Sequence, residues 1–354
     1  MKSPVIFVPT QDDDFGPAFQ QQLKLALGLA TDGLDRTPTE PWVIKVPLGS
    51  ADPLSAELME LTRTAFLEAG FTTGPYLDNL SITTEGLDTT QGLLSRAGKL
   101  GLDNFQVGDD PQGAPSETLL LSDDCSLASV GLPPVAAEAA GLLLINGVRP
   151  HPFLGLGGAL FALGSDLLDR ATKIRLHRAV KPTVDTPLCA GCGSCLGACI
   201  FDAITFKGGR ASIDHKLCTG CGECMGACHL GGIGPENGMD ILRYQKMVAE
   251  SGGAVALKSR AGLNGSLFYI NFLTPLPRQA GGSFGRDRFL KENIGALLST
   301  DLVVLDQAIW DLLVQDAVHG LRQWSGFLQE PAPLMERAEA LGMGRRQYNL
   351  IIQN

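Results

Sequence analysis

The sequence predicts an α/β protein with a mostly parallel sheet, whose α/β body is interrupted by a small, cysteine-rich α+β domain. Short apolar runs rich in β-branched residues alternate with helix-like segments on both sides of the middle of the chain, as in βα layers around a parallel sheet. Eight of the nine cysteines lie between positions 189 and 228, where this alternation stops. We therefore expect a first part of the body over 1–181, the cysteine-rich domain over 182–236 and a second part of the body over 237–354.

The first part of the body contains four strand-like runs and two helix-like segments. The strands are expected over 5–9, 42–47, 117–123 and 141–146, the last two as buried strands. One helix is expected over 15–34. A second helix is expected over 54–70, with Asp52 as its N-cap and Pro53 at its first position.

The second part of the body resumes the alternation. Its expected elements are a helix over 240–251, a strand over 266–273, a Gly/Pro-rich loop over 274–285, a strand over 294–299 and a helix over 301–318. Asp301 is well placed to cap the last helix. The pattern leaves open whether the two parts form one lobe or two.

The cysteine-rich segment contains the same phrase twice, 29 positions apart. "LCAGCGSCLGACIFDAI" begins at Leu188 and "LCTGCGECMGACHLGGI" begins at Leu217, and the repeat extends to Val184/Ile213 and Asp185/Asp214. Each phrase has the spacing C-x2-C-x2-C-x3-C, and "ITFKGGRASID" between them predicts a hairpin turning at Gly208 and Gly209. We interpret the segment as a duplicated half-domain related by a pseudo-two-fold axis.

The spacing is that of bacterial ferredoxins with two [4Fe–4S] clusters, in which the fourth cysteine of each run binds the other cluster. The predicted cofactors are therefore two [4Fe–4S] clusters. The predicted ligands are Cys189, Cys192, Cys195 and Cys228 for one cluster, and Cys218, Cys221, Cys224 and Cys199 for the other. Small residues between the ligands let backbone N–H groups approach the cluster sulfurs. Ile200 and His229 stand where ferredoxins usually have proline, so exposure and potential of the clusters stay open.

Zinc is the alternative metal. Structural zinc sites usually take two separated pairs of ligands, and two triplet-plus-one runs fit that pattern poorly. The remaining cysteine, Cys125, is isolated from any histidine in sequence, so we expect a buried structural thiol rather than a nucleophile.

The chain resembles the iron–sulfur family called domain of unknown function 362, in which an α/β body carries or lacks a two-cluster ferredoxin insert. The resemblance rests on residues 142–182, including Gly157, Gly158, Ala159, Lys173 and His177, and on residues 266–313 after the clusters. It differs from the family at Phe161 and Ala162, where relatives have a Lys-Asn pair. The resemblance implies this architecture and supplies no reaction.

Weaker features leave alternatives open. The segment "FLGLGGALFALG" after the strand 141–146 is placed like a phosphate-cradling loop, but Leu160 occupies the last glycine position of that motif, and close helix–sheet packing is the favoured interpretation. The stretch from Arg170 to Lys181 contains five basic residues and no acid. It fits a solvated helix end, compensation of the charge of anionic clusters, or a docking surface for an acidic redox partner. Asp301, Asp306 and Asp311 lie on or near one predicted helix, and we expect them to cap the helix or to be exposed to solvent. No constellation of catalytic residues is predicted, so catalysis stays open.

Charge and composition exclude several partners. The net charge of −10 without a long basic stretch argues against nucleic acid, and no apolar run is long enough for a membrane span. The N-terminus lacks the apolar core of a signal peptide, so we expect a cytoplasmic protein. The expected function is electron transfer through two [4Fe–4S] clusters to a redox partner protein or to a substrate at the α/β body. The alternatives are an oxidoreductase whose body binds its own substrate or organic cofactor, and a redox-sensing or structural cluster protein. The oligomeric state is open.

Overall fold

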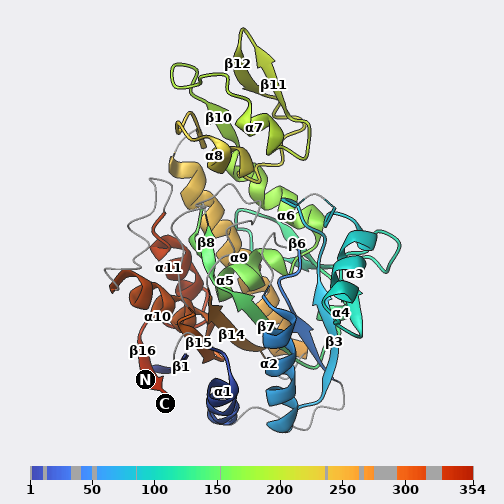
Figure 1. Cartoon of the computed structure of the whole chain (residues 1–354), viewed down its shortest axis with the longest axis vertical. Coiled ribbons are helices and arrows are strands. Elements are labelled where there is room, and N and C mark those ends of the chain that lie inside the picture. The colour runs from blue at the N-terminus through green and yellow to red at the C-terminus, as the bar shows by residue number, and fades with distance from the viewer. Residues whose placement is uncertain are drawn as a thin grey trace.

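A single large sheet organises the α/β body (Figure 1). The structure is a computed structural model that describes residues 2–10, 14–32, 41–49, 54–84, 86–151, 153–235, 238–262, 267–274, 293–315 and 329–353. The sheet has eight strands in the order β16 (Tyr348–Ile352), β1 (Ser3–Pro9), β15 (Gly295–Ser299), β14 (Leu267–Leu273), β7 (Leu142–Gly147), β2 (Trp42–Lys45), β3 (Thr73–Asp78) and β4 (Phe105–Val107).

The sheet is mostly parallel, as the sequence predicts. Only β15 runs antiparallel to its neighbours β1 and β14, and the other paired strands are parallel. Strands from 1–181 and from 237–354 pair directly, because β7 lies beside β14 with Asn146 opposite Asn271. Within this sheet the two parts of the body therefore form one lobe.

Helices cover both faces of the sheet. One face packs against α1 (Pro17–Ala30), α2 (Ala56–Glu68) and α3 (Thr90–Lys99). The other packs against α4 (Pro134–Ala137), α5 (Ala159–Phe161), the π-helical turn η1 (Ala162–Asp166), α6 (Arg170–His177), the 3₁₀ turn η2 (Arg178–Val180), α9 (Gly238–Gly262), α10 (Leu302–Gln315) and α11 (Ala332–Ala340). The central strand β7 serves both cores, since Leu142 and Leu144 point to one and Leu143 and Ile145 to the other.

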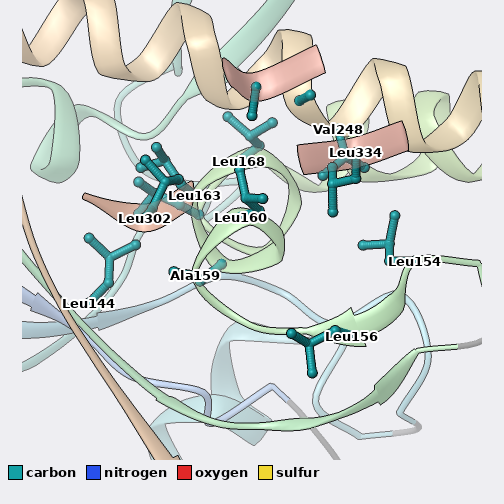
Figure 2. Packing of buried hydrophobic residues seen from close by; sticks show 14 of the residues in the cluster. Leu144, Leu154, Leu156, Ala159, Leu160, Leu163, Leu168, Val248, Leu302 and Leu334 are labelled. Atoms are coloured by element: carbon teal, nitrogen blue, oxygen red, sulfur yellow. The ribbon is translucent and has the colours of Figure 1, made fainter. Parts of the chain in front are cut away.

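The second of these cores is built around η1 (Figure 2). Leu160, Leu163 and Leu168 lie among side chains of β7, α9, α10 and α11. Gly164 permits the close approach of α9, because a Cβ at this position would overlap the carbonyl oxygen of Val248. The glycine-rich segment predicted after β7 thus serves close packing.

Four short two-stranded sheets complete the structure. They are β5 (Glu117–Leu120) with β6 (Ser129–Leu132), β8 (Arg149–His151) with β9 (Gly155–Gly157), β10 (Pro182–Val184) with β13 (Ile233–Pro235), and β11 (Ile204–Lys207) with β12 (Arg210–Ile213). The sequence correctly predicts a strand within 117–123, but the prediction that this strand is buried is wrong. β5 lies outside the large sheet, and Leu120 is 81% exposed.

Helix ends differ from the predictions in two places. Ser55, not Asp52, caps α2 by accepting a hydrogen bond from the backbone N–H of Leu58, and Asp52 and Pro53 lie outside the described residues. The helix predicted over 240–251 extends from Gly238 to Gly262 as α9. Asp301 caps α10 as predicted, accepting from the N–H groups of Val303 and Val304. Most of the predicted loop over 274–285 also lies outside the described residues.

The cysteine-rich segment lies at one end of the molecule, far from both termini (Figure 1). It contains the short helices α7 (Ser194–Gly197) and α8 (Glu223–Ala227) and the hairpin β11–β12, which turns at Gly208 and Gly209 as predicted. Among the described helices, none combines the length and the apolar character that crossing a membrane requires.

Candidate functional site

The two cysteine runs have the same local backbone. Gly193 and Gly222 precede α7 and α8 with φ of 85° and 88°, both in the left-handed region that favours glycine. The N–H of Cys189 donates to the carbonyl of Asp185, and the N–H of Cys218 donates to that of Asp214, its counterpart 29 residues later. The sequence repeat is therefore a structural repeat as well.

The thiols of each run have electrostatic neighbours in the other run. The thiol of Cys195 interacts electrostatically with Cys189, Cys192 and Cys228, so its fourth neighbour comes from the other run. The thiols of Cys221 and Cys224 likewise interact electrostatically with Cys218 and with Cys199. Cys224 also interacts electrostatically with Cys195. We call Cys189, Cys192, Cys195 and Cys228 the first cysteine set, and Cys218, Cys221, Cys224 and Cys199 the second cysteine set.

The second cysteine set lines a pocket. All four of its cysteines border it, together with apolar side chains that include Phe201, Ile204 and Ile213. The hydroxyl oxygen of Thr219, also in the lining, is buried and has no hydrogen-bond partner among the described residues. Four thiols around an apolar pocket with one unpaired polar atom fit a sulfur-rich cluster better than a core of packed cysteines.

Burial sets the protonation of these thiols. It raises the pKa of Cys221 to about 12 and also raises the pKa values of Cys218, Cys224 and Cys195. Hydrogen bonds from Ser194 lower the pKa of the exposed Cys192. The backbone N–H groups of Ala211 and Gly232 donate to sulfurs of the first cysteine set. Metal binding must therefore displace protons from the buried thiols, which makes it pH-dependent.

Single-ion sites are a separate question. Within the described residues, which include all eight cysteines, no three His, Cys, Asp or Glu side chains gather closely enough to hold one metal ion. A zinc site needs its sulfurs about 2.3 Å from a single ion. In a cubane each thiolate binds a different iron, so its four sulfurs do not converge on one ion. The two [4Fe–4S] clusters stay a prediction.

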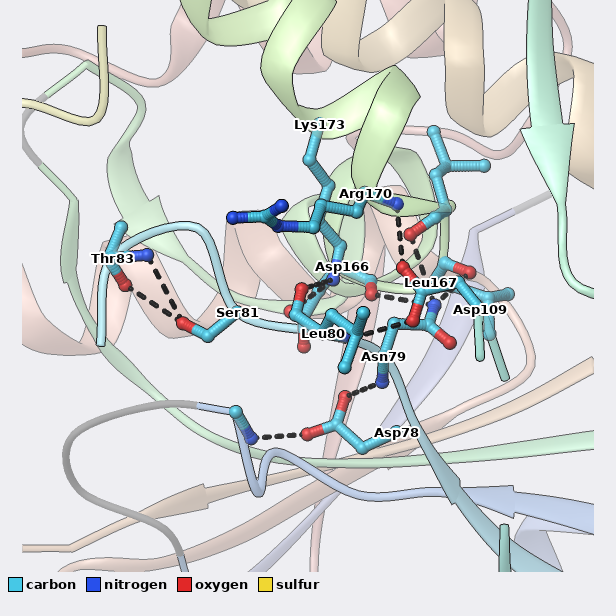
Figure 3. A network of polar contacts seen from close by, with 12 residues as sticks. Asp78, Asn79, Leu80, Ser81, Thr83, Asp109, Asp166, Leu167, Arg170 and Lys173 are labelled. Carbon is cyan, nitrogen blue, oxygen red and sulfur yellow. Dashed lines mark hydrogen bonds and ion pairs between the residues drawn. The ribbon is translucent and has the colours of Figure 1, made fainter. Parts of the chain in front are cut away.

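A second polar site, which the sequence reading missed, lies at the carboxyl ends of β2 and β3 (Figure 3). The Lys45 side chain is fully buried, and its ammonium lies 2.7 Å from both Asp78 Oδ1 and Asp166 Oδ2 and donates to the carbonyl of Val46. Asp166 is the last residue of η1, and Lys173 of α6 lies 4.0 Å from it. Carboxyl ends of parallel strands and π-helical turns are both frequent places for binding sites.

Burial and the neighbouring charges shift the pKa values of this network in opposite directions. Burial raises the pKa of Asp166, but the ammonium groups of Lys45 and Lys173 outweigh it and lower the pKa to about 2. Burial lowers the pKa of Lys45, and the two carboxylates more than offset this. For Asp78 the effect of burial exceeds the opposing effect of Lys45 and Lys173, and its pKa is raised. Asp109, which accepts from the N–H groups of Leu80 and Arg170, also has a raised pKa because it is buried.

The basic segment that begins at Arg170 is not one solvated face. Lys173 is buried and donates to the carbonyl of Leu80, and His177 is buried as well, while Arg178 is exposed. The interpretation of this face as a docking surface that includes Lys173 is therefore wrong. A sequence signal did exist for the network, because Lys45 interrupts an otherwise apolar strand.

The other weak candidates have structural roles. The backbone N–H groups of Ala159 and Leu160, which a phosphate-cradling loop would present, donate to the carboxylate of the buried Asp306. The phosphate interpretation is therefore wrong. Asp311 accepts hydrogen bonds from Gln307 and Tyr348. Cys125 is half-buried rather than buried, with Ser122 and Arg337 beside its sulfur.

Comparisons with known proteins add little to this geometry. No protein-family model matches the chain, and no curated protein does. The chain is 12% identical to the lactate racemase apoprotein from Thermoanaerobacterium thermosaccharolyticum, covering 84% of this chain and 54% of that one with a TM-score of 0.39. It is 13% identical to a protein from Thermotoga maritima, covering 91% and 59% with a TM-score of 0.37. The chain spans little more than half the length of these structures, and likenesses this low carry no argument. The resemblance to the domain of unknown function 362 stays a prediction.

Proposed function

We propose that this chain is an iron–sulfur protein that holds two [4Fe–4S] clusters in its two cysteine sets. The observation that supports this most directly is the pocket of the second cysteine set, in which Cys199 of the first run lies with Cys218, Cys221 and Cys224 of the second. When bound, such clusters supply one-electron transfer, here between a redox partner protein and a partner or substrate at the α/β body.

The residues around the sets support this role by shaping the environment of the thiolates. Phe201, Ile204 and Ile213 exclude water from the second cysteine set. The N–H groups of Ala211 and Gly232 stabilise negative charge on the sulfurs of the first. Both effects influence reduction potential, because hydrogen bonds to sulfur and solvent exposure are two of its main determinants.

Anaerobic purification followed by metal and sulfide analysis tests the proposal. We expect about eight iron and eight acid-labile sulfide per chain, with broad visible absorbance that dithionite bleaches. Cys125→Ser is the matched control, since Cys125 lies outside both sets and its loss should leave the iron content unchanged. A protein that contains zinc alone and no labile sulfide would contradict the proposal.

A second candidate function is an oxidoreductase whose body binds its own substrate or organic cofactor. The buried network of Lys45, Asp78, Asp166 and Lys173 at the carboxyl ends of β2 and β3 favours it. A flavin or nucleotide that copurifies in stoichiometric amount would support this function over simple electron transfer.

A further inference from the structure

The two cysteine runs are equal in sequence but unequal in their surroundings. Ala190 in the first run is exposed, whereas its counterpart Thr219 in the second is buried with 7% exposure. Cys192 is exposed and its counterpart Cys221 is partly buried. The second run is therefore enclosed by the protein where the first is open to solvent.

The neighbours of two equivalent glycines explain the difference. Gly191 and Gly220 both have positive φ, at 69° and 80°. A Cβ on Gly191 would overlap the carbonyl oxygen of Gly209, in the exposed turn between β11 and β12. A Cβ on Gly220 would instead overlap the carbonyl oxygen of His177, at the end of α6 in the α/β body. The first run packs against the outlying hairpin and the second against the body (Figure 1).

His177 joins the second run to the interior of the body. Its Nδ1 lies 3.4 Å from the carbonyl oxygen of Gly220 and its Nε2 lies 3.0 Å from the hydroxyl of Tyr244. Because a carbonyl can only accept, Nδ1 carries the proton and Nε2 accepts from Tyr244. His177 and Lys173 both belong to α6, one helical turn apart, and Lys173 lies 4.0 Å from Asp166 of the buried network. The second run thus contacts the same helix that contributes Lys173 to that network.

Thr219 distinguishes the two sets chemically. Its hydroxyl is buried beside the second cysteine set and has no partner among the described residues. A buried hydroxyl that stays unpaired costs free energy, so this position favours an acceptor in the pocket. The sulfur atoms of a cluster are such acceptors, and Ala190 offers the first cysteine set no equivalent donor.

We propose, on the basis of the function proposed above, that the two cysteine sets are an outer and an inner cluster site. The second cysteine set is the inner site, enclosed against the α/β body, and the hydroxyl of Thr219 donates a hydrogen bond to the cluster bound there. The first cysteine set is the outer site, open to solvent and to an external one-electron carrier protein. The inner site is the one nearer to any group bound at the network of Lys45 and Asp166, because its run contacts α6, which contributes Lys173 to that network.

The test uses redox titrations of the anaerobically purified protein followed by electron paramagnetic resonance. Thr219→Val removes the hydroxyl at constant shape, and we expect it to shift the potential of one cluster to lower values and leave the other unchanged. Thr219→Ser retains the hydroxyl and should behave like the parent. A water-soluble dysprosium chelate should then enhance the relaxation of the unshifted cluster more strongly, because that cluster is the outer one.

The outcomes separate this inference from the function on which it rests. If iron and sulfide analysis finds no clusters, the proposed function fails. If both clusters are present but Thr219→Val shifts neither, or the shifted cluster is the one more strongly relaxed by the chelate, the clusters are bound and the assignment of inner and outer sites is overturned.

Discussion

Replacing Lys45 by methionine tests the energetics of the buried network. Methionine retains an unbranched side chain of similar length but removes the ammonium, whose donors are all used by Asp78, Asp166 and the carbonyl of Val46. The change leaves two carboxylates without their main counter-charge, and the side chain of Asp78 is only 1% exposed. Removing one partner of a buried ion pair typically costs about 3–5 kcal/mol, so we expect the variant to be less stable by that amount at neutral pH.

The structure offers a matched control at the surface. Lys24 and Glu68 form an ion pair of 2.8 Å, nearly the same length, but their side chains are 42% and 50% exposed. Exposed pairs contribute at most about 1 kcal/mol. Lys24→Met should therefore change the free energy of unfolding far less than Lys45→Met.

The effect of Lys45→Met should also depend on pH. The pKa of Asp166 is lowered to about 2, so its attraction to Lys45 contributes fully above the unfolded-state value of 3.8 and is lost as the pH falls through about 2. The stability difference between parent and variant should therefore be largest near neutral pH and should narrow as falling pH protonates first Asp78, whose pKa is raised, and then Asp166.

Urea unfolding of the parent and both variants provides the measurement. Tryptophan fluorescence and circular dichroism should give coincident transitions, so that the free energies can be compared. A loss below about 1 kcal/mol for Lys45→Met, or a loss equal to that of Lys24→Met, would refute the view that burial gives this network its strength.

Two further predictions concern the cysteine sets and the buried Asp306. Cys199→Ser should damage the cluster of Cys218, Cys221 and Cys224 more than the cluster next to it in sequence, which electron paramagnetic resonance of the reduced protein can check; loss confined to the cluster of Cys189, Cys192 and Cys195 would show that each run binds alone. Burial raises the pKa of Asp306 to about 7. Between pH 4 and pH 7 the folded state thus holds a proton that the unfolded state releases, and stability should fall by about 3 kcal/mol over this range. Asp306→Asn should remove this slope in urea unfolding, and an unchanged slope would locate its origin elsewhere.

The sequence predicted the framework of the sheet well because buried parallel strands have a simple pattern. The apolar runs over 5–9, 42–47, 141–146, 266–273 and 294–299 correspond to five of the eight strands. The sequence reading missed β3, which contains Gly74 and Pro75 and so resembles a turn, and it missed the three-residue β4. The final 30 residues could be read as helical or extended, so strand β16 was not assigned.

The two candidate sites differ in how well the sequence predicts them. The cysteine runs are local motifs, and their crossing follows from the repeat itself. The buried network joins Lys45, Asp78 and Asp166, which are far apart in sequence and meet only through the order of the strands and the position of η1. Spacing along the chain contains no information about such a meeting.

The antiparallel pairing of β10 with β13 has a consequence for how the chain folds. Pro182 lies opposite Pro235, so the chain enters and leaves the cysteine-rich segment at one point, and none of the eight strands of the large sheet lies between them. Strands β7 and β14 must pair across about 120 intervening residues. Once the segment has closed on itself, the effective loop between the two strands is much shorter, and closing it costs less entropy. Because the contacts inside the segment are local, it can fold early and reduce the entropic cost of joining the two parts of the sheet. If the segment binds the proposed clusters, their assembly would also accelerate folding of the body.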